Sequence, residues 1–86
     1  MFVEKKKKIW ITKLDCRGDM ELYEKVLEVC LNISQIDETF GYEYDEQYIY
    51  ILSDSRDQAY QRGSWFHNKI SSKILYRVYY RLEKED

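Results

Sequence analysis

Four stretches of the chain alternate between aliphatic and more polar residues, and the alternation predicts β-strands. They are residues 7–14 (KKIWITKL), 39–44 (TFGYEY), 48–52 (YIYIL) and 73–82 (KILYRVYYRL). Successive side chains of a strand point to opposite faces, so a two-residue repeat indicates a strand with one buried face. Only the tripeptide 45–47 (DEQ) separates the two middle stretches, and this spacing predicts a β-hairpin.

Two other segments have the repeat of three to four residues that is typical of an amphipathic helix. The first begins after Asp19, a favourable N-cap residue. Its predicted inner face is Leu22, Val26, Val29, Cys30 and Ile33. The second begins with the capping box of Ser55 and Gln58 and ends at the serine pair 71–72. Its predicted inner face is Ala59, Gly63, Phe66 and Ile70. A glycine inside a helix costs about 1 kcal/mol relative to alanine, so Gly63 predicts a close approach of this helix to the sheet.

The predicted order of elements is therefore β-α-β-β-α-β. With right-handed crossovers, this order gives a four-stranded antiparallel sheet with both helices on one face, which is the ferredoxin-like α+β fold. A chain of 86 residues suffices for one such domain, predicted to span residues 1–86. The other face of the sheet has no helix to cover it.

Alternation also predicts which side chains lie on this uncovered face. Isoleucine and valine belong in the dry layer under the helices, so the arginine-bearing side of the last strand is predicted to be open. The outward residues of the last strand are Leu75, Arg77, Tyr79 and Arg81. Those of the third strand are Tyr48, Tyr50 and Leu52.

The first strand raises a question, because its largest apolar side chain, Trp10, stands between Ile9 and Ile11. We expect the two isoleucines to face the helices, which leaves Trp10 and Thr12 on the uncovered face. Aromatic and arginine side chains in solvent are typical of a contact surface. The predicted binding residues are Trp10, Tyr48, Tyr50, Arg77, Tyr79 and Arg81.

The element order and two short motifs resemble the RNA-recognition-motif family, which has an aromatic hexamer on its first strand and an aromatic octamer on its third. Residues 9–14 (IWITKL) resemble the hexamer, with Trp10 at the stacking position. Residues 46–53 (EQYIYILS) are similar to the octamer, with Tyr48 and Tyr50 at its stacking positions. The resemblance implies that bases of single-stranded RNA or DNA stack on the sheet.

The distribution of charge separates this hypothesis from a second one. The net charge is −2, but residues 14–45 contain two basic and nine acidic residues, a local charge of −7. The octamer-like segment begins with Glu46 and Gln47, where the family has a basic residue and glycine. Because contacts to phosphate supply most of the affinity for nucleic acid, this acidity favours a protein partner, or a homodimer through the sheet face.

The composition gives a further resemblance, to small phage-encoded anti-defence proteins such as anti-CRISPR inhibitors. The chain is short, has no proline and contains 9 tyrosines. This resemblance implies an inhibitor of a nucleic-acid-handling enzyme, with the acidic segment from Asp15 to Asp45 imitating phosphate. The solvated face of a helix is the better explanation for Glu21, Glu24 and Glu28.

We expect no enzymatic activity, because the sequence has no phosphate loop and no catalytic triad. His67, the only histidine, is predicted to be structural or exposed, and Asp15 is predicted to be a turn residue. Cys16 and Cys30 lack the spacing of a zinc site, so no metal or other cofactor is expected. Cys30 is predicted to be a core residue and Cys16 a surface thiol.

No apolar run approaches the roughly 18 residues of a membrane span. The first nine residues (MFVEKKKKI) also lack the apolar core of a signal peptide. We therefore expect a cytoplasmic protein with no membrane partner.

Overall fold

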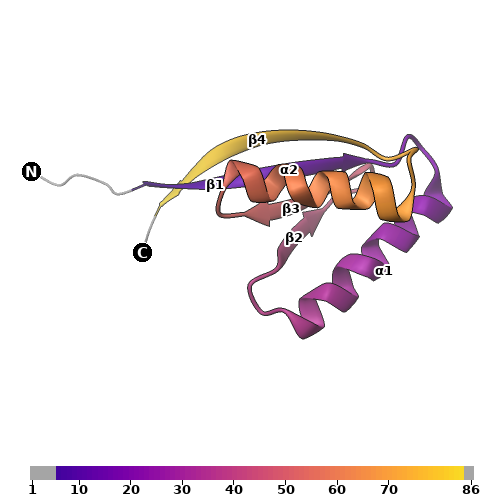
Figure 1. Ribbon diagram of the computed structural model, residues 1–86, viewed down its shortest axis with the longest axis horizontal. Coiled ribbons are helices and arrows are strands. Elements are labelled where there is room, and N and C mark those ends of the chain that lie inside the picture. Colours follow the sequence, from indigo (N-terminus) through magenta and orange to yellow (C-terminus); the bar gives the residue numbers. More distant parts are fainter. Residues whose placement is uncertain (1–5, 85–86) are drawn as a thin grey trace, which may run out of the picture.

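The computed structural model describes residues 6–84 and confirms the predicted order of elements and the ferredoxin-like α+β fold (Figure 1). The elements are β1 (Lys6–Asp15), α1 (Met20–Ile36), β2 (Gly41–Tyr44), β3 (Tyr48–Ser53), α2 (Arg56–Trp65), a π-helical turn η1 (Phe66–Ile70) and β4 (Leu75–Lys84). The four strands form one antiparallel sheet in the order β2-β3-β1-β4. Part of the basic start of the chain, residues 1–5, lies outside the described residues.

Both helices begin where their cap residues predict. The side chain of Asp19 accepts a hydrogen bond from the Leu22 N–H at 3.1 Å, and Ser55 Oγ accepts one from the Gln58 N–H at 3.2 Å. Gln58 Oε1 in turn accepts from the Asp54 N–H at 3.2 Å, one residue before the position of the usual capping box. These bonds satisfy backbone donors that have no partner inside a helix.

The core is one layer of apolar side chains between the helices and the sheet. β1, α1, β3 and η1 contribute Leu14, Val26, Cys30, Ile49, Ile51 and Phe66, all 0–2% exposed. Residues of α1, η1 and β3 belong to one buried cluster, so the two helical segments cover the same face of the sheet. Cys30 is thus the core residue that its helical position predicts.

Cys16 also lies in the core, so the prediction of a surface thiol is wrong. It is 2% exposed, because β1 runs through Asp15 and the chain reverses only at Arg17 and Gly18, which have φ angles of 57° and 78°. Burial raises the pKa of the Cys16 thiol to about 11, helped by the nearby carboxylates of Asp15 and Asp19. A thiol with such a pKa stays protonated and unreactive at neutral pH.

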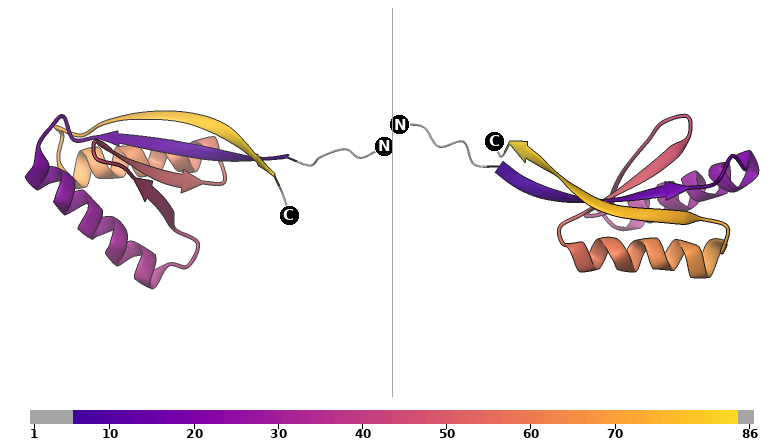
Figure 2. Two further views of the ribbon diagram at one scale, coloured as in Figure 1. Left: turned by 180° about the vertical axis from the view of Figure 1, so that it is seen from behind. Right: turned by 90° about the horizontal axis from the view of Figure 1, so that it is seen from above.

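The sheet twists strongly, and its strands differ in length. β1 and β4 each have 10 residues and pair along their whole length, whereas β2 has 4 residues and β3 has 6. Seen from above, the β2–β3 hairpin turns away from the β1–β4 pair, and α2 runs beside that pair (Figure 2). The β1–β4 pair therefore forms a long ribbon that extends past the start of α2 (Figure 1).

Gly63 marks the predicted close approach of α2 to the sheet. A Cβ atom at this position would lie 2.4–2.8 Å from three ring atoms of Tyr76 on β4. The aromatic ring thus occupies the space that any other residue would need, and the helix can lie at this distance only because residue 63 has no side chain.

We predict that Gly63→Ala destabilises the protein by roughly 1–3 kcal/mol, the usual cost of overpacking a core. Helix propensity alone predicts the opposite sign, a gain of about 1 kcal/mol. Urea unfolding followed by circular dichroism measures the change, with Gln61→Ala on the exposed side of α2 as the control. A Gly63→Ala variant as stable as the wild type would contradict the packing described.

Candidate functional site on the open sheet face

The side of the sheet opposite the helices carries side chains from all four strands, and we call it the open face. Thr12 identifies the other side, because its hydroxyl donates a hydrogen bond to the Ala59 carbonyl of α2 at 2.7 Å. Residues that pair across antiparallel strands point to the same side, so the register assigns every other position. The open face consists of Lys7, Ile9, Ile11, Lys13, Asp15, Gly41, Glu43, Tyr48, Tyr50, Leu52, Leu75, Arg77, Tyr79, Arg81 and Glu83.

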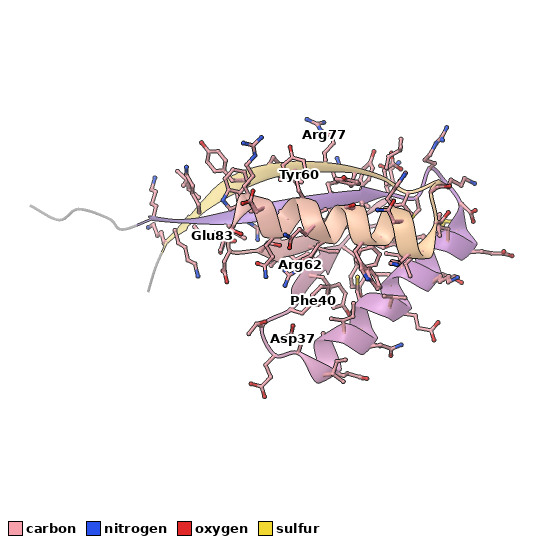
Figure 3. All side chains as sticks on the ribbon, viewed as in Figure 1. Asp37, Phe40, Tyr60, Arg62, Arg77 and Glu83 are labelled. Atoms are coloured by element: carbon pink, nitrogen blue, oxygen red, sulfur yellow. The ribbon has the colours of Figure 1, made fainter. Side chains whose placement is uncertain are left out.

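Five of the six predicted binding residues lie on this face. They are Tyr48, Tyr50, Arg77, Tyr79 and Arg81. The rings of Tyr48 and Tyr50 are 6.4 Å apart in an edge-on arrangement. Tyr79 is 39% exposed, and Arg77 projects from β4 into solvent (Figure 3).

Trp10 lies on the helix side, so its predicted placement is wrong. It pairs with Ser53 and alternates with Ile11, and its ring contacts that of Tyr80 at 5.2 Å between centroids. The position that the resemblance gave to a stacking residue is therefore on the wrong face of β1. The prediction assumed that the isoleucines of β1 face the helices. Ile11 is indeed only 2% exposed, but it lies on the open face.

An ion pair joins the two edge strands across the open face. Arg81 on β4 donates to both carboxylate oxygens of Glu43 on β2, at 3.0 and 3.2 Å. Because β1 and β3 lie between these strands, the pair passes over the middle of the open face, where Ile11 and Leu52 are paired. Glu83 holds the same guanidinium at 2.7 Å, so Arg81 is fixed by two carboxylates.

A second polar cluster holds the tyrosines of β3 in place. The Tyr50 hydroxyl donates to Asp45 Oδ2 at 2.7 Å, and Asp45 Oδ1 accepts from the N–H groups of Gln47 and Tyr48 at 2.8 Å. The hydrogen bond to this carboxylate, with partial burial, raises the pKa of Tyr50 to about 12. The Lys13 ammonium lies 3.9 Å from the centre of the Tyr48 ring, at cation–π distance.

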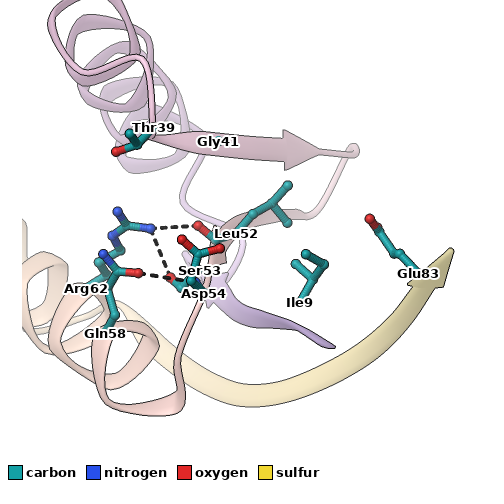
Figure 4. A pocket seen from close by; sticks show the side chains of 9 residues that line it. All are labelled: Ile9, Thr39, Gly41, Leu52, Ser53, Asp54, Gln58, Arg62 and Glu83. Carbon is teal, nitrogen blue, oxygen red and sulfur yellow. Dashed lines mark hydrogen bonds between the residues drawn. The ribbon is translucent and has the colours of Figure 1, made fainter. Parts of the chain in front are cut away.

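A hollow opens at the end of the open face where β2 begins (Figure 4). Arg62 of α2 reaches into it and donates to the Leu52 carbonyl at 2.6 Å and to Ser53 Oγ at 3.0 Å. Pairing between β2 and β3 ends at Gly41 and Leu52, so the guanidinium binds the backbone where the ladder stops. Burial lowers the pKa of Arg62, and the role of this side chain is structural.

His67 and Asp15 both make hydrogen bonds to the backbone. His67 Nδ1 lies 2.8 Å from the Ile74 carbonyl oxygen and donates to it, and an Asp15 oxygen accepts from the Arg17 N–H at 2.8 Å, which forms the predicted turn. Within residues 6–84, no three His, Cys, Asp or Glu side chains come together as ligands for a metal ion. No helix in that range has the length and apolarity to cross a membrane.

The Glu43–Arg81 pair predicts a small acid-dependent loss of stability. The hydrogen bonds from Arg81 lower the pKa of Glu43 in the folded protein, so the pair stabilises the fold above the unfolded pKa and is lost as the pH falls through the folded one. Because both side chains are partly exposed, its contribution is at most about 1 kcal/mol. Urea unfolding at about pH 6 and about pH 3 should show a smaller loss for Glu43→Gln than for the wild type.

The control for this experiment is Glu46→Gln, which removes an exposed carboxylate from the same hairpin. It should keep the wild-type loss between the two pH values. Equal losses for the wild type and Glu43→Gln would contradict the ion pair across the open face.

Comparisons with protein-family models, with curated proteins and with solved structures find no significant match to this chain. The functional inference therefore depends on the geometry and chemistry of the open face.

Proposed function

We propose that the protein is a non-enzymatic binding module whose open face docks on a protein partner. The observation that supports this proposal is an exposed, aromatic sheet face with no excess of positive charge. Its strands contribute four basic residues, Lys7, Lys13, Arg77 and Arg81, and three acidic ones, Asp15, Glu43 and Glu83. Asp45 at the hairpin turn, hydrogen-bonded to Tyr50, is a fourth acid.

This balance favours protein over nucleic acid. A surface that binds a phosphate backbone needs cations that are free to replace counterions. Here Arg81 forms ion pairs with Glu43 and Glu83, and Lys7 Nζ lies 3.8 Å from Asp54 Oδ1, so these two cations already have acidic partners. Tyrosine and arginine beside aliphatic residues such as Leu52 and Leu75 are instead typical of the energetic centre of protein–protein interfaces.

The acidic half of the molecule supports a narrower form of the proposal, in which the partner is a nucleic-acid-handling enzyme. The carboxylates of Glu21, Glu24 and Glu28 are exposed on α1, within the segment of charge −7. Such an enzyme has a basic groove for its substrate, and a row of carboxylates attracts the groove electrostatically. The module would then act as an inhibitor that the acidic segment attracts to the enzyme and that binds through the open face.

Single-stranded RNA or DNA is the second candidate ligand, and one observation favours it. Lys13 and Arg77 pair across β1 and β4 on the open face, at the level of Tyr50. Bases could stack on the tyrosines at about 1–3 kcal/mol each while these two cations contact phosphates.

Binding experiments with matched variants distinguish the two. We expect the immobilised wild type to retain a protein from an extract of the organism that encodes it. Tyr79→Ala should weaken that complex by roughly tenfold or more, the effect of a hot-spot residue. Tyr44→Ala is the matched control, because Tyr44 is 61% exposed but points to the helix side of β2, and it should bind like the wild type.

Fluorescence anisotropy with labelled random single-stranded RNA and DNA tests the second candidate. The protein-binding proposal predicts no saturable binding at low salt. Micromolar binding that weakens steeply with salt and is lost in Tyr50→Ala would overturn it in favour of nucleic acid.

A further inference from the structure

The free edge of the sheet at β4 has the properties of a self-association surface. β4 is 10 residues long, lies at the end of the strand order and pairs with β1 without a bulge from Leu75 to Lys84. Its other edge presents backbone N–H and C=O groups that no strand among residues 6–84 pairs with. Proteins usually protect such an edge with proline, a bulge or a covering loop, and this chain contains no proline.

Large apolar side chains flank this edge on both faces of the sheet. On the open face Leu75 is 50% exposed and Tyr79 39%, and on the helix side Tyr80 is 49% and Leu82 53% exposed. Tyr60 and Trp65 of α2, each 42% exposed, line a shallow hollow with Tyr76 of β4. Apolar side chains thus accompany the unpaired backbone along the whole strand.

We propose that β4 pairs antiparallel with β4 of a second copy of this chain, so that two sheets join into one of eight strands. A two-fold axis perpendicular to the sheet keeps both helix layers on the same side. Paired residues of the two copies must then point to the same side of the joined sheet. Because side chains alternate along a strand, this is true only when the axis passes through a residue of β4 and not between two residues.

The charges of the side chains that each register pairs distinguish these registers. A register centred on Arg77, Tyr79 or Arg81 places arginine opposite arginine, which is unfavourable. A register centred on Val78 pairs only residues 75–81 of β4. The register centred on Tyr80 pairs residues 76–84. It places Arg77 of each copy opposite Glu83 of the other copy, which gives two such pairs.

The other pairs in this register are also favourable. Tyr79 lies opposite Arg81 of the second copy on the open face, which allows a cation–π contact. On the helix side Val78 lies opposite Leu82, and the two Tyr80 rings meet at the axis. The inference does not depend on the proposed function, because it concerns the backbone edge and not the partner of the open face.

Charge reversal tests the register directly. Arg77→Glu places two carboxylates opposite each other at each end of the pairing, and Glu83→Arg places two guanidinium groups there. Each variant alone should raise the dimer dissociation constant roughly tenfold or more, measured by sedimentation velocity. An equimolar mixture of the two variants restores both opposite-charge pairs and should form a heterodimer.

Lys25→Glu on the exposed face of α1 is the control, and it should dimerise like the wild type. Circular dichroism of each variant verifies that it is folded. A wild-type chain that stays monomeric at about 0.1 mM, roughly the limit of a weak association, overturns the proposal. So does a dimer that survives both single reversals, or a mixture that fails to associate.

Discussion

The orientation of β1 determines the rest of the molecule. β1 is a central strand that pairs with β3 on one side and β4 on the other, so its side-chain alternation fixes that of both neighbours. The hydrogen bond from Thr12 to the Ala59 carbonyl anchors one side of β1 under α2. A shift of β1 by one residue would exchange its two faces, placing Trp10 and Thr12 on the open face and Ile11 under the helices.

Much of this arrangement follows from the sequence, because several local signals agree. Asp19 and Ser55 cap the helices, and the contrast between isoleucine and tyrosine in β3 leaves one choice for its inner face. The order of elements then gives the antiparallel sheet, and Gly63 indicates how closely α2 approaches it.

The errors have physical causes that a local pattern does not contain. In β1 both alternations include apolar residues, and Ile11 is buried on the open face, which an ion pair between Glu43 and Arg81, 38 residues apart in sequence, crosses. Cys16 is predicted to be a surface thiol, but its side chain continues the inward alternation of Leu14. The burial of Ile11 and of Cys16 depends on how distant segments pack together, which the local sequence pattern does not specify.

Contacts between side chains also order the open face. Lys13 on Tyr48, Asp45 on Tyr50 and the carboxylates on Arg81 fix side chains that would otherwise be mobile. A surface ordered in this way loses less side-chain entropy when a partner binds. It also has fewer free cations than a surface built for phosphate, which is why we favour a protein partner.

Nuclear Overhauser contacts of the Thr12 methyl group test the orientation of β1 most directly. The structure predicts contacts to the Ala59 methyl group and to Val78, which pairs with Thr12 on the helix side. Contacts from Thr12 to Tyr79 and Leu52 would contradict it, because they would place Thr12 and Trp10 together on the open face.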